Sequence, residues 1–260
     1  MVQVKAKKKL GQNFLIDNFV INKIGESINA SIDDLIVEIG PGKGALTKVL
    51  KKKESNLVCI ELDKDLIPIL KALEDNKTTV INEDILKVDL NSIINKYTYN
   101  KLFIVGNLPY YITTPIIKHI IDSNIDADEL LFMVQNEVAD RFTSKPGNKE
   151  YGSITLYLKY YFNIDKLFIV NRSSFNPVPK VESAIIRFTK RLNKPDIDTS
   201  KYFKLISDSF KYKRKTLKNN LSNYNFSIIE NILNTNGYPS NVRAEDLDED
   251  MFIRILKENK

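Results

Sequence analysis

The sequence predicts an α/β fold in which a βαβ-type sheet carries helices on both faces, followed by a small domain built from helices. Two observations lead to this fold class: short β-branched runs alternate with longer helical patterns over the first 190 residues, and the strand-like runs are continuously apolar. Such runs are typical of strands that are buried on both faces of a sheet. A third observation is that strand-like runs stop after Arg191, which predicts a helical C-terminal domain.

The expected strands are short runs of β-branched and other apolar residues bounded by polar ones. In chain order they are Leu35–Ile39, Leu57–Leu62, Thr79–Asn82, Leu102–Val105, Leu130–Val134, Lys166–Val170 and Ala184–Phe188. Between them, apolar residues at helical spacing predict the helices Asp17–Ile28, Lys43–Lys52, Asp65–Glu74, Thr114–Ser123, Asn136–Ser144 and Tyr151–Phe162. Asp17 is the expected N-cap of the first helix, because an aspartate side chain accepts hydrogen bonds from the free N–H groups of a first turn.

A polar, proline-bearing stretch at 193–196 marks the joint between two expected domains, 1–191 and 192–260. The second domain is expected to contain helices that break at 223–225 and at 236–240, where asparagine, glycine, proline and serine gather.

Charge is distributed unevenly along the chain, whose formal net charge is +6. An N-terminal arm, residues 1–16, carries four lysines and no acid, and residues 201–220 carry seven basic side chains against one acid. Two basic regions on a nearly neutral body indicate a polyanionic partner. Nucleic acid fits better than a membrane, because neither region has the aromatic, apolar face of an interfacial helix. Charge alone leaves a solvated lysine-rich surface open as the alternative.

The chain has one cysteine, Cys59, and one histidine, His119. One thiol cannot build a disulfide framework, a cysteine-rich zinc site or an iron–sulfur cluster, so no metal is expected. Cys59 lies inside a strand and His119 on a helix, and neither is assigned a role. The start of the chain lacks the order of a signal peptide, and we expect a cytoplasmic protein.

A glycine-rich turn with Gly40 and Gly42 follows the first strand and opens the next helix. Glycine permits a tight turn and lets a ligand approach the backbone closely. Glu61 lies 21 residues after Gly40 at a strand end, where a doubly wound sheet holds the hydroxyls of an adenosine ribose. The third expected strand is followed by Glu83 and Asp84, and either of these acids can accept a hydrogen bond from an adenine amino group. This pattern predicts a nucleoside cofactor; an ordinary strand–helix turn with solvated acids is the alternative.

The fourth strand ends in Asn107-Leu108-Pro109-Tyr110, which indicates the reaction. The exocyclic amine of adenine is a poor nucleophile because its lone pair is delocalised into the ring. The side-chain oxygen of Asn107 and the backbone carbonyl of Leu108 are suitable acceptors for its two N–H groups. Tyr110 offers a flat face on which an extruded base can stack. A strand-terminating turn without catalytic function is the alternative.

These motifs, taken in order, resemble those of the ribosomal RNA adenine dimethyltransferases over essentially the whole chain. The residues that carry the resemblance are Gly11-Gln12-Asn13-Phe14-Leu15, Glu38-Ile39-Gly40-Pro41-Gly42, Glu61, Asp84, Asn107–Tyr110, Thr114-Pro115 and Phe175–Ser183. The resemblance implies a class I, Rossmann-like methyltransferase fold with a mostly parallel sheet of seven strands. Pro41, the segment Lys213–Leu221 and the segment Arg243–Leu247 resemble the KsgA group more than the Erm group of macrolide-resistance enzymes.

The resemblance also implies site residues, a cofactor and a partner. S-adenosylmethionine would be the cofactor, with contacts from Asn13, Leu15, Gly40, Gly42, Glu61, Asp84, Ile85 and Asn107. Catalytic roles would fall to Asn107, Leu108, Tyr110 and Phe175, the last beside the pocket.

The implied activity is dimethylation of two adjacent adenosines near the 3′ end of small-subunit ribosomal RNA. The implied partner is that RNA in a ribosome assembly intermediate, held by residues 192–260, and the default oligomeric state is a monomer. Two alternatives stay open: an Erm-type enzyme acting on large-subunit RNA, and a mainly non-catalytic ribosome-assembly factor.

Overall fold

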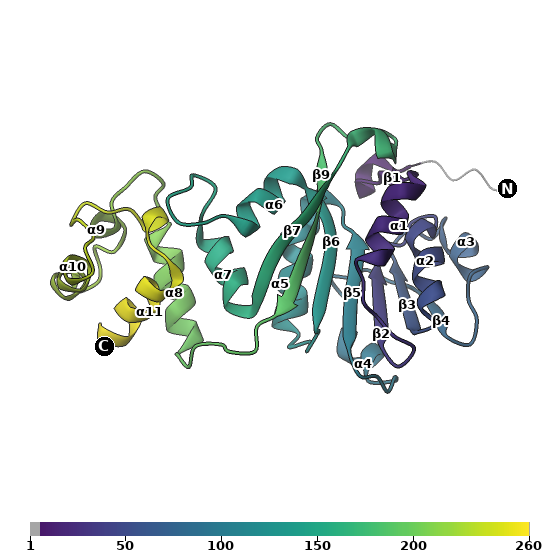
Figure 1. Ribbon diagram of the computed structural model, residues 1–260, viewed down its shortest axis with the longest axis horizontal. Helices are drawn as coiled ribbons and strands as arrows, with labels where there is room; N and C mark the ends of the chain where they lie inside the picture. The colour runs from purple at the N-terminus through teal and green to yellow at the C-terminus, as the bar shows by residue number, and fades with distance from the viewer. Residues whose placement is uncertain (1–5, 260) are drawn as a thin grey trace. The chain divides into compact units, whose positions relative to one another are not determined.

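The sheet has seven strands in the order β4-β3-β2-β5-β6-β9-β7 (Figure 1). The computed structural model describes residues 6–259. The strands are β2 (Leu35–Ile39), β3 (Asn56–Glu61), β4 (Thr78–Asn82), β5 (Leu102–Asn107), β6 (Glu129–Gln135), β7 (Phe162–Val170) and β9 (Ser183–Lys190). The pairs β3–β4, β2–β3, β2–β5 and β5–β6 are parallel, whereas β9 runs antiparallel to β6. The mostly parallel sheet is therefore confirmed, and the carboxyl ends of β2, β3, β4 and β5 meet at one edge.

Helices cover both faces of this sheet (Figure 1). They are α1 (Asn18–Glu26), α2 (Ala45–Leu50), α3 (Ile67–Lys71), α4 (Leu90–Ile94) and α5 (Thr113–Asp122). Two more helices, α6 (Asn136–Thr143) and α7 (Ser153–Tyr161), follow β6 along the chain. The buried side chains of α1, α2 and α3 share one apolar cluster with alternate residues of the strands, among them Ile36 and Phe103. Asp17 caps α1 as predicted, since its side chain accepts from the N–H groups of Phe19 and Val20.

Several local features differ from the predictions. Helix α3 begins at Ile67 rather than Asp65, because Asp63 holds the preceding residues in a turn through bonds from Asp65 N and Leu66 N. Phe162 begins β7 instead of ending α7. Helix α4 was not predicted at all; it is five residues long and capped by the side chain of Asp89.

A two-stranded sheet was also missed. β1 (Phe14–Leu15) pairs antiparallel with β8 (Phe175–Asn176). The end of the N-terminal segment, defined here as residues 7–16, therefore lies beside a segment far away in the sequence. Strands of two residues are too short to give a periodic pattern.

The chain divides into two compact units. One comprises the chain up to Ala139 together with Asp165–Lys190, and the other comprises Asp140–Ile164 and everything from Arg191 on. The second unit contains α8 (Thr199–Ser209), α9 (Leu217–Asn220), α10 (Phe226–Thr235) and α11 (Glu249–Glu258). The change of unit at Arg191 lies next to the predicted boundary, but Asp140–Ile164 was expected in the first domain. It groups with the second because Tyr151, Leu156 and Tyr160 share an apolar cluster with residues of α8 to α11.

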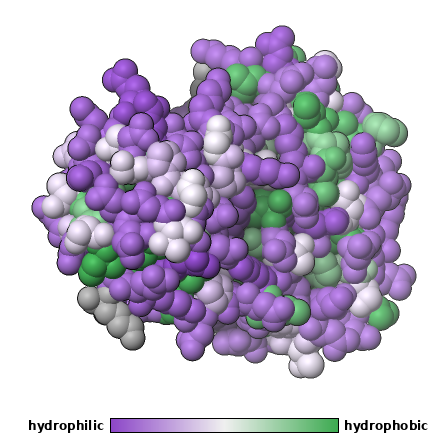
Figure 2. Space-filling model, turned by 60° about the vertical axis from the view of Figure 1, so that its left-hand side comes forward, coloured by the Kyte–Doolittle hydropathy of each residue, from purple (hydrophilic) through white to green (hydrophobic). Residues whose placement is uncertain are grey.

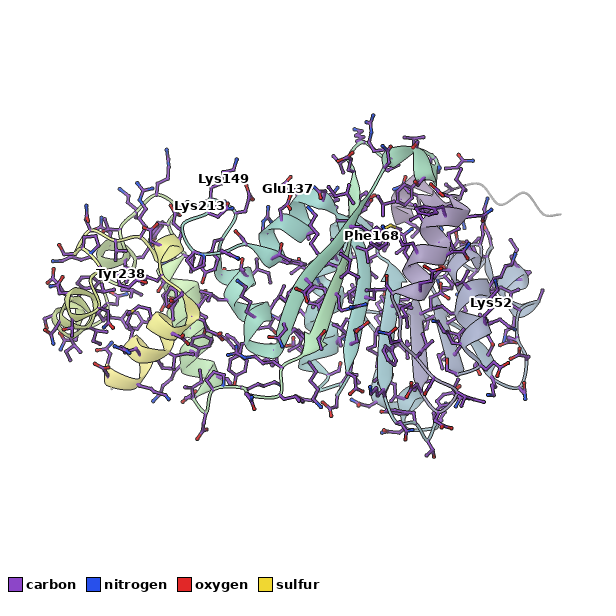
Figure 3. All side chains as sticks on the ribbon, in the orientation of Figure 1. Lys52, Glu137, Lys149, Phe168, Lys213 and Tyr238 are labelled. Atoms are coloured by element: carbon purple, nitrogen blue, oxygen red, sulfur yellow. The ribbon has the colours of Figure 1, made fainter. Side chains whose placement is uncertain are left out.

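Hydrophilic side chains dominate the face of the molecule drawn in Figure 2, where apolar residues form only small patches. Lys149 and Lys213, labelled in Figure 3, are exposed side chains of the second unit. Within residues 6–259 no helix is long and apolar enough to span a bilayer.

Candidate active site

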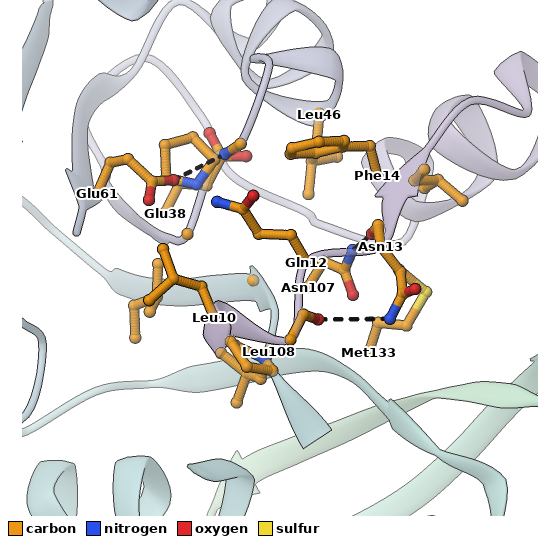
Figure 4. A pocket seen from close by; sticks show the side chains of 18 of the residues that line it. Leu10, Gln12, Asn13, Phe14, Glu38, Leu46, Glu61, Asn107, Leu108 and Met133 are labelled. Atoms are coloured by element: carbon orange, nitrogen blue, oxygen red, sulfur yellow. Dashed lines mark hydrogen bonds between the residues drawn. The ribbon is translucent and has the colours of Figure 1, made fainter. Parts of the chain in front are cut away.

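A cavity of about 380 Å³ opens at the sheet edge where the carboxyl ends of the parallel strands meet (Figure 4). Residues from Leu10 to Ile16 form one wall, and the turns after β2, β3, β4 and β5 form the others. All of the predicted site residues except Phe175 line it: Asn13, Leu15, Gly40, Gly42, Glu61, Asp84, Ile85, Asn107, Leu108 and Tyr110. The structure thus brings together residues that are spread over nearly a hundred positions of the sequence.

Phe175 lies outside this lining. Its ring is 1% exposed and belongs to the apolar cluster under the N-terminal segment, where its backbone pairs with Leu15. The neighbouring Asn176 lines the cavity instead. A ring in this position has no free face for a base.

The turn after β2 is shaped by its glycines. Gly40 and Gly42 have φ angles of +66° and +60°, a backbone conformation that favours glycine. A Cβ atom on Gly42 would also lie 3.2 Å from the ring of Phe14, closer than an ordinary van der Waals contact, so the ring would have to shift to admit a side chain there. Both glycines line the cavity with backbone atoms alone.

Glu61 ends β3 with its carboxylate directed at the same turn. Its two oxygens accept hydrogen bonds from the N–H groups of Gly42, at 3.0 Å, and Asp63, at 2.8 Å. Burial raises the pKa of this carboxyl group, and the two backbone bonds oppose that shift. A carboxylate offers about four acceptor positions, so about two remain for the hydroxyls of a ribose. This side chain fits the nucleoside cofactor that the sequence predicts.

Asp84 and Ile85 follow β4 and line the next part of the cavity. The side chain of Asp84 accepts from the N–H of Leu86 at 3.0 Å, which fixes the turn. Ile85 is 7% exposed and gives an apolar wall beside it. An acid and an apolar wall together suit the polar edge and the flat face of an adenine.

Asn107 ends β5 opposite the N-terminal segment. Its amide nitrogen donates to the carbonyl oxygen of Asn13 at 3.1 Å, which fixes the side chain and assigns its oxygen the role of acceptor. The N–H of Leu108 donates to the carbonyl of Met133 at 3.2 Å. The first bond fixes the side chain of Asn107 and the second fixes the backbone at Leu108, so both acceptors predicted for an amine are held in place.

Tyr110 is fixed as well. Its hydroxyl group lies 2.7 Å from that of Ser183 on β9, in hydrogen-bonding distance. Burial raises the pKa of the phenol, so the side chain is neutral at physiological pH. A neutral, anchored ring at the cavity wall can stack on a base through its face.

The N-terminal segment is anchored by residues that the sequence reasoning missed. The buried carboxylate of Asp63 accepts from the ammonium group of Lys7 and, at 2.7 Å, from the amide of Gln12. Burial alone would raise the pKa of Asp63, but these donors lower it below its usual value. Lys7 also pairs with Asp65 at 2.6 Å. No local pattern signals a contact between residues 56 positions apart in the sequence.

Glu38 is a buried acid in the same cavity lining. Its carboxyl group is 2% exposed and accepts from the hydroxyl of Thr47 at 2.6 Å and from the thiol of Cys59 at 3.6 Å. Burial raises its pKa from 4.5 to about 7. Among the described residues, no group of three or more histidine, cysteine, aspartate or glutamate side chains is arranged to hold a metal ion.

Comparisons with known proteins agree with these features. The family model described as "Ribosomal RNA adenine dimethylase" matches residues 3–260. "Ribosomal RNA small subunit methyltransferase A" of Mycoplasma mycoides is 40% identical to this chain, covering 97% of both chains.

Two solved structures are similar in fold. A dimethyladenosine transferase from Plasmodium falciparum has a TM-score of 0.77 and 25% identity, covering 94% of this chain and 96% of that one. The 23S rRNA methyltransferase ErmE has a TM-score of 0.77 and 24% identity, covering 95% and 99%.

Proposed function

Since the chain belongs to the ribosomal RNA adenine dimethylase family, we propose that it dimethylates the 6-amino groups of two adjacent adenosines near the 3′ end of small-subunit ribosomal RNA. It is an S-adenosylmethionine-dependent methyltransferase. The observation that carries the proposal is the cavity in which Asn107, Tyr110 and Glu61 meet.

S-adenosylmethionine supplies a methyl group on a sulfonium, whose thioether is already a good leaving group. We assign its ribose hydroxyls to Glu61 and its adenine to Asp84 and Ile85, with Gly40 and Gly42 giving backbone access. Asn13 and Leu15 hold the cofactor from the N-terminal segment. The free acceptor positions of Glu61 and the glycine turn support this assignment.

Asn107 and Leu108 act on the substrate amine. Their oxygens accept the two N–H groups, which favours a pyramidal nitrogen with an available lone pair. Each methyl transfer makes the nitrogen cationic, and it then releases one proton to solvent. One N–H therefore remains after the first methylation, and one acceptor is enough to orient it for the second. Both groups are fixed before the substrate arrives, so catalysis is mainly positioning.

Tyr110 holds the extruded adenine by stacking, which contributes about 1–3 kcal/mol per base. The hydrogen bond between its hydroxyl and Ser183 supports this role, because a ring held at its far end loses little freedom on binding. Phe175 is left out of the proposal because its ring is buried.

The small-subunit RNA is favoured over large-subunit RNA as the substrate. The 40%-identical relative named for the small subunit supports this choice, whereas the likeness to ErmE at 24% identity supports the fold alone. We propose further that the RNA is met within a ribosome assembly intermediate in the cytoplasm, and that the enzyme is a monomer. The basic residues between Lys201 and Lys218 would bind phosphates, with an affinity that falls as salt rises.

Asn107→Ala tests the proposed mechanism, and Asn91→Ala, an exposed substitution on α4, is its matched control. We expect Asn107→Ala to remain folded and to lose methyl transfer to small subunits even when cofactor is saturating. The Asn91→Ala protein should keep wild-type activity. Appreciable dimethylation by the Asn107 variant would overturn the mechanism. A variant without activity that still restores subunit assembly in cells would favour the assembly-factor alternative.

A further inference from the structure

Two neighbouring tyrosines at the cavity have different surroundings. Tyr110 is half-buried and anchored to Ser183, whereas the side chain of Tyr111 is 61% exposed while lining the same cavity. Two other exposed apolar side chains line the cavity, Ile16 and Leu62, but neither has an aromatic face. Tyr111 is therefore an exposed aromatic ring directly beside the residue assigned to the target base.

The position of Tyr111 is fixed by its neighbours. It lies in the single helical turn Tyr110–Ile112, closed by a 3.1 Å bond from Ile112 N to Pro109 O, and α5 follows directly. A Cβ atom on Gly11 would lie 3.0 Å from Cε1 and 3.3 Å from Cδ1 of Tyr111. One edge of the ring thus packs on the backbone of the N-terminal segment, and the rest of the ring meets solvent.

Extruding an adenosine leaves the adjacent base without its stacking partner, which costs a few kcal/mol. An aromatic ring at the rim can replace that partner, and stacking is tolerant of which base it receives. A side chain with two rotatable bonds that is already held along one edge loses little entropy on binding. The exposed ring of Tyr111 meets each of these requirements.

We propose that Tyr111 is a second stacking residue, which receives the nucleotide next to the target while Tyr110 holds the target itself. The proposal rests on the proposed function. Because the two target adenosines are adjacent, the partner of Tyr111 during methylation of one adenosine is the other.

The test compares Tyr111→Ala and Tyr111→Phe with a control, Ile32→Ala. Ile32 is a similarly exposed apolar side chain that precedes the amino end of β2, away from the carboxyl ends that form the cavity. Initial rates are measured on small subunits that lack the modification, and cofactor affinity is measured by calorimetry. We expect Tyr111→Ala to raise the KM for subunits by about 5- to 150-fold, the range that base–aromatic stacking supports. Tyr111→Phe should restore the wild-type KM, and Ile32→Ala should not change it.

A second measurement locates the stacked base. Subunits are reconstituted with RNA in which the nucleotide beside a single target is abasic, and wild type and Tyr111→Ala are compared on them. The expected result is that the difference between the two proteins largely disappears, since the stacking partner is gone.

Three results would overturn the proposal: an unchanged KM in Tyr111→Ala, a Tyr111→Phe protein as impaired as Tyr111→Ala, or a loss confined to cofactor affinity. A loss confined to cofactor affinity would mean that the Tyr111 ring supports the N-terminal segment and does not stack on RNA. Failure of the proposed function is distinguishable, because wild type itself would then methylate no adenosine in the subunits.

Discussion

Glu38 makes the stability of the fold depend on pH. Its carboxyl group is almost fully buried at the end of β2, and burial raises its pKa from 4.5 to about 7. Thr47 and Cys59 donate to it and oppose this shift without cancelling it. The folded protein therefore binds the proton more tightly than the unfolded chain does.

The sign and size of the effect follow from this difference. A carboxyl group whose pKa is higher in the folded state gives its full stabilisation below about pH 4.5, and this is lost as pH rises through about 7. The difference between the two pKa values corresponds to about 3 kcal/mol of unfolding free energy. Glu61, whose pKa burial also raises, changes stability in the same direction.

Glu38→Gln removes the titration while keeping the size of the side chain and an oxygen that accepts from Thr47. We expect the variant to gain stability relative to wild type between pH 5 and pH 8, by up to about 3 kcal/mol. Thermal unfolding followed by circular dichroism at several pH values measures this gain. Glu26→Gln, an exposed position on α1, is the control and should follow the wild-type profile. Parallel profiles for wild type and Glu38→Gln would contradict a raised pKa of Glu38 in the folded protein.

Three further perturbations have defined outcomes. Asp63→Ala removes the buried acceptor for Lys7 and Gln12 and should raise the cofactor Kd by about 5- to 30-fold. Its control, Asp65→Ala, removes an exposed partner of Lys7 and should change the Kd less than about 3-fold. Equal effects of the two substitutions, measured by calorimetry, would contradict the role of Asp63 in anchoring the N-terminal segment. Gly106→Ala should lower the free energy of unfolding by about 1–3 kcal/mol, because the new Cβ would lie 2.5 Å from the carbonyl oxygen of Ile39. An unchanged melting temperature would contradict this close approach. Replacing the basic residues 213–215 with glutamine should reduce the slope of log affinity against log salt in RNA-binding titrations; an unchanged slope would exclude them from the interface.

Most of the sheet could be predicted from the sequence because β2, β3, β5, β6 and most of β9 are buried on both faces and therefore almost continuously apolar. The cavity could be predicted for a related reason. Parallel strands bring their carboxyl ends to one edge, so residues such as Glu61 and Asn107 that end successive strands must converge. The order of strand and helix therefore carried most of the information about this site.

Helix α4 was missed although its cap is local, but the other large omissions depend on contacts between distant segments. Lys7 reaches Asp63, and β1 pairs with β8, without any periodic pattern in either partner. Asp140–Ile164 was assigned to the first domain because it follows the strands in sequence, whereas its apolar side chains pack with helices that begin at Thr199. Such pairings are set by tertiary packing, which local patterns do not encode.

The most direct test is transfer of labelled methyl groups from S-adenosylmethionine to two substrates that lack the modification: small ribosomal subunits and large-subunit RNA. Digestion to nucleosides then identifies the product. We expect label in N6,N6-dimethyladenosine from the small subunit. Label confined to large-subunit RNA, or subunit binding without any methylation, would contradict it.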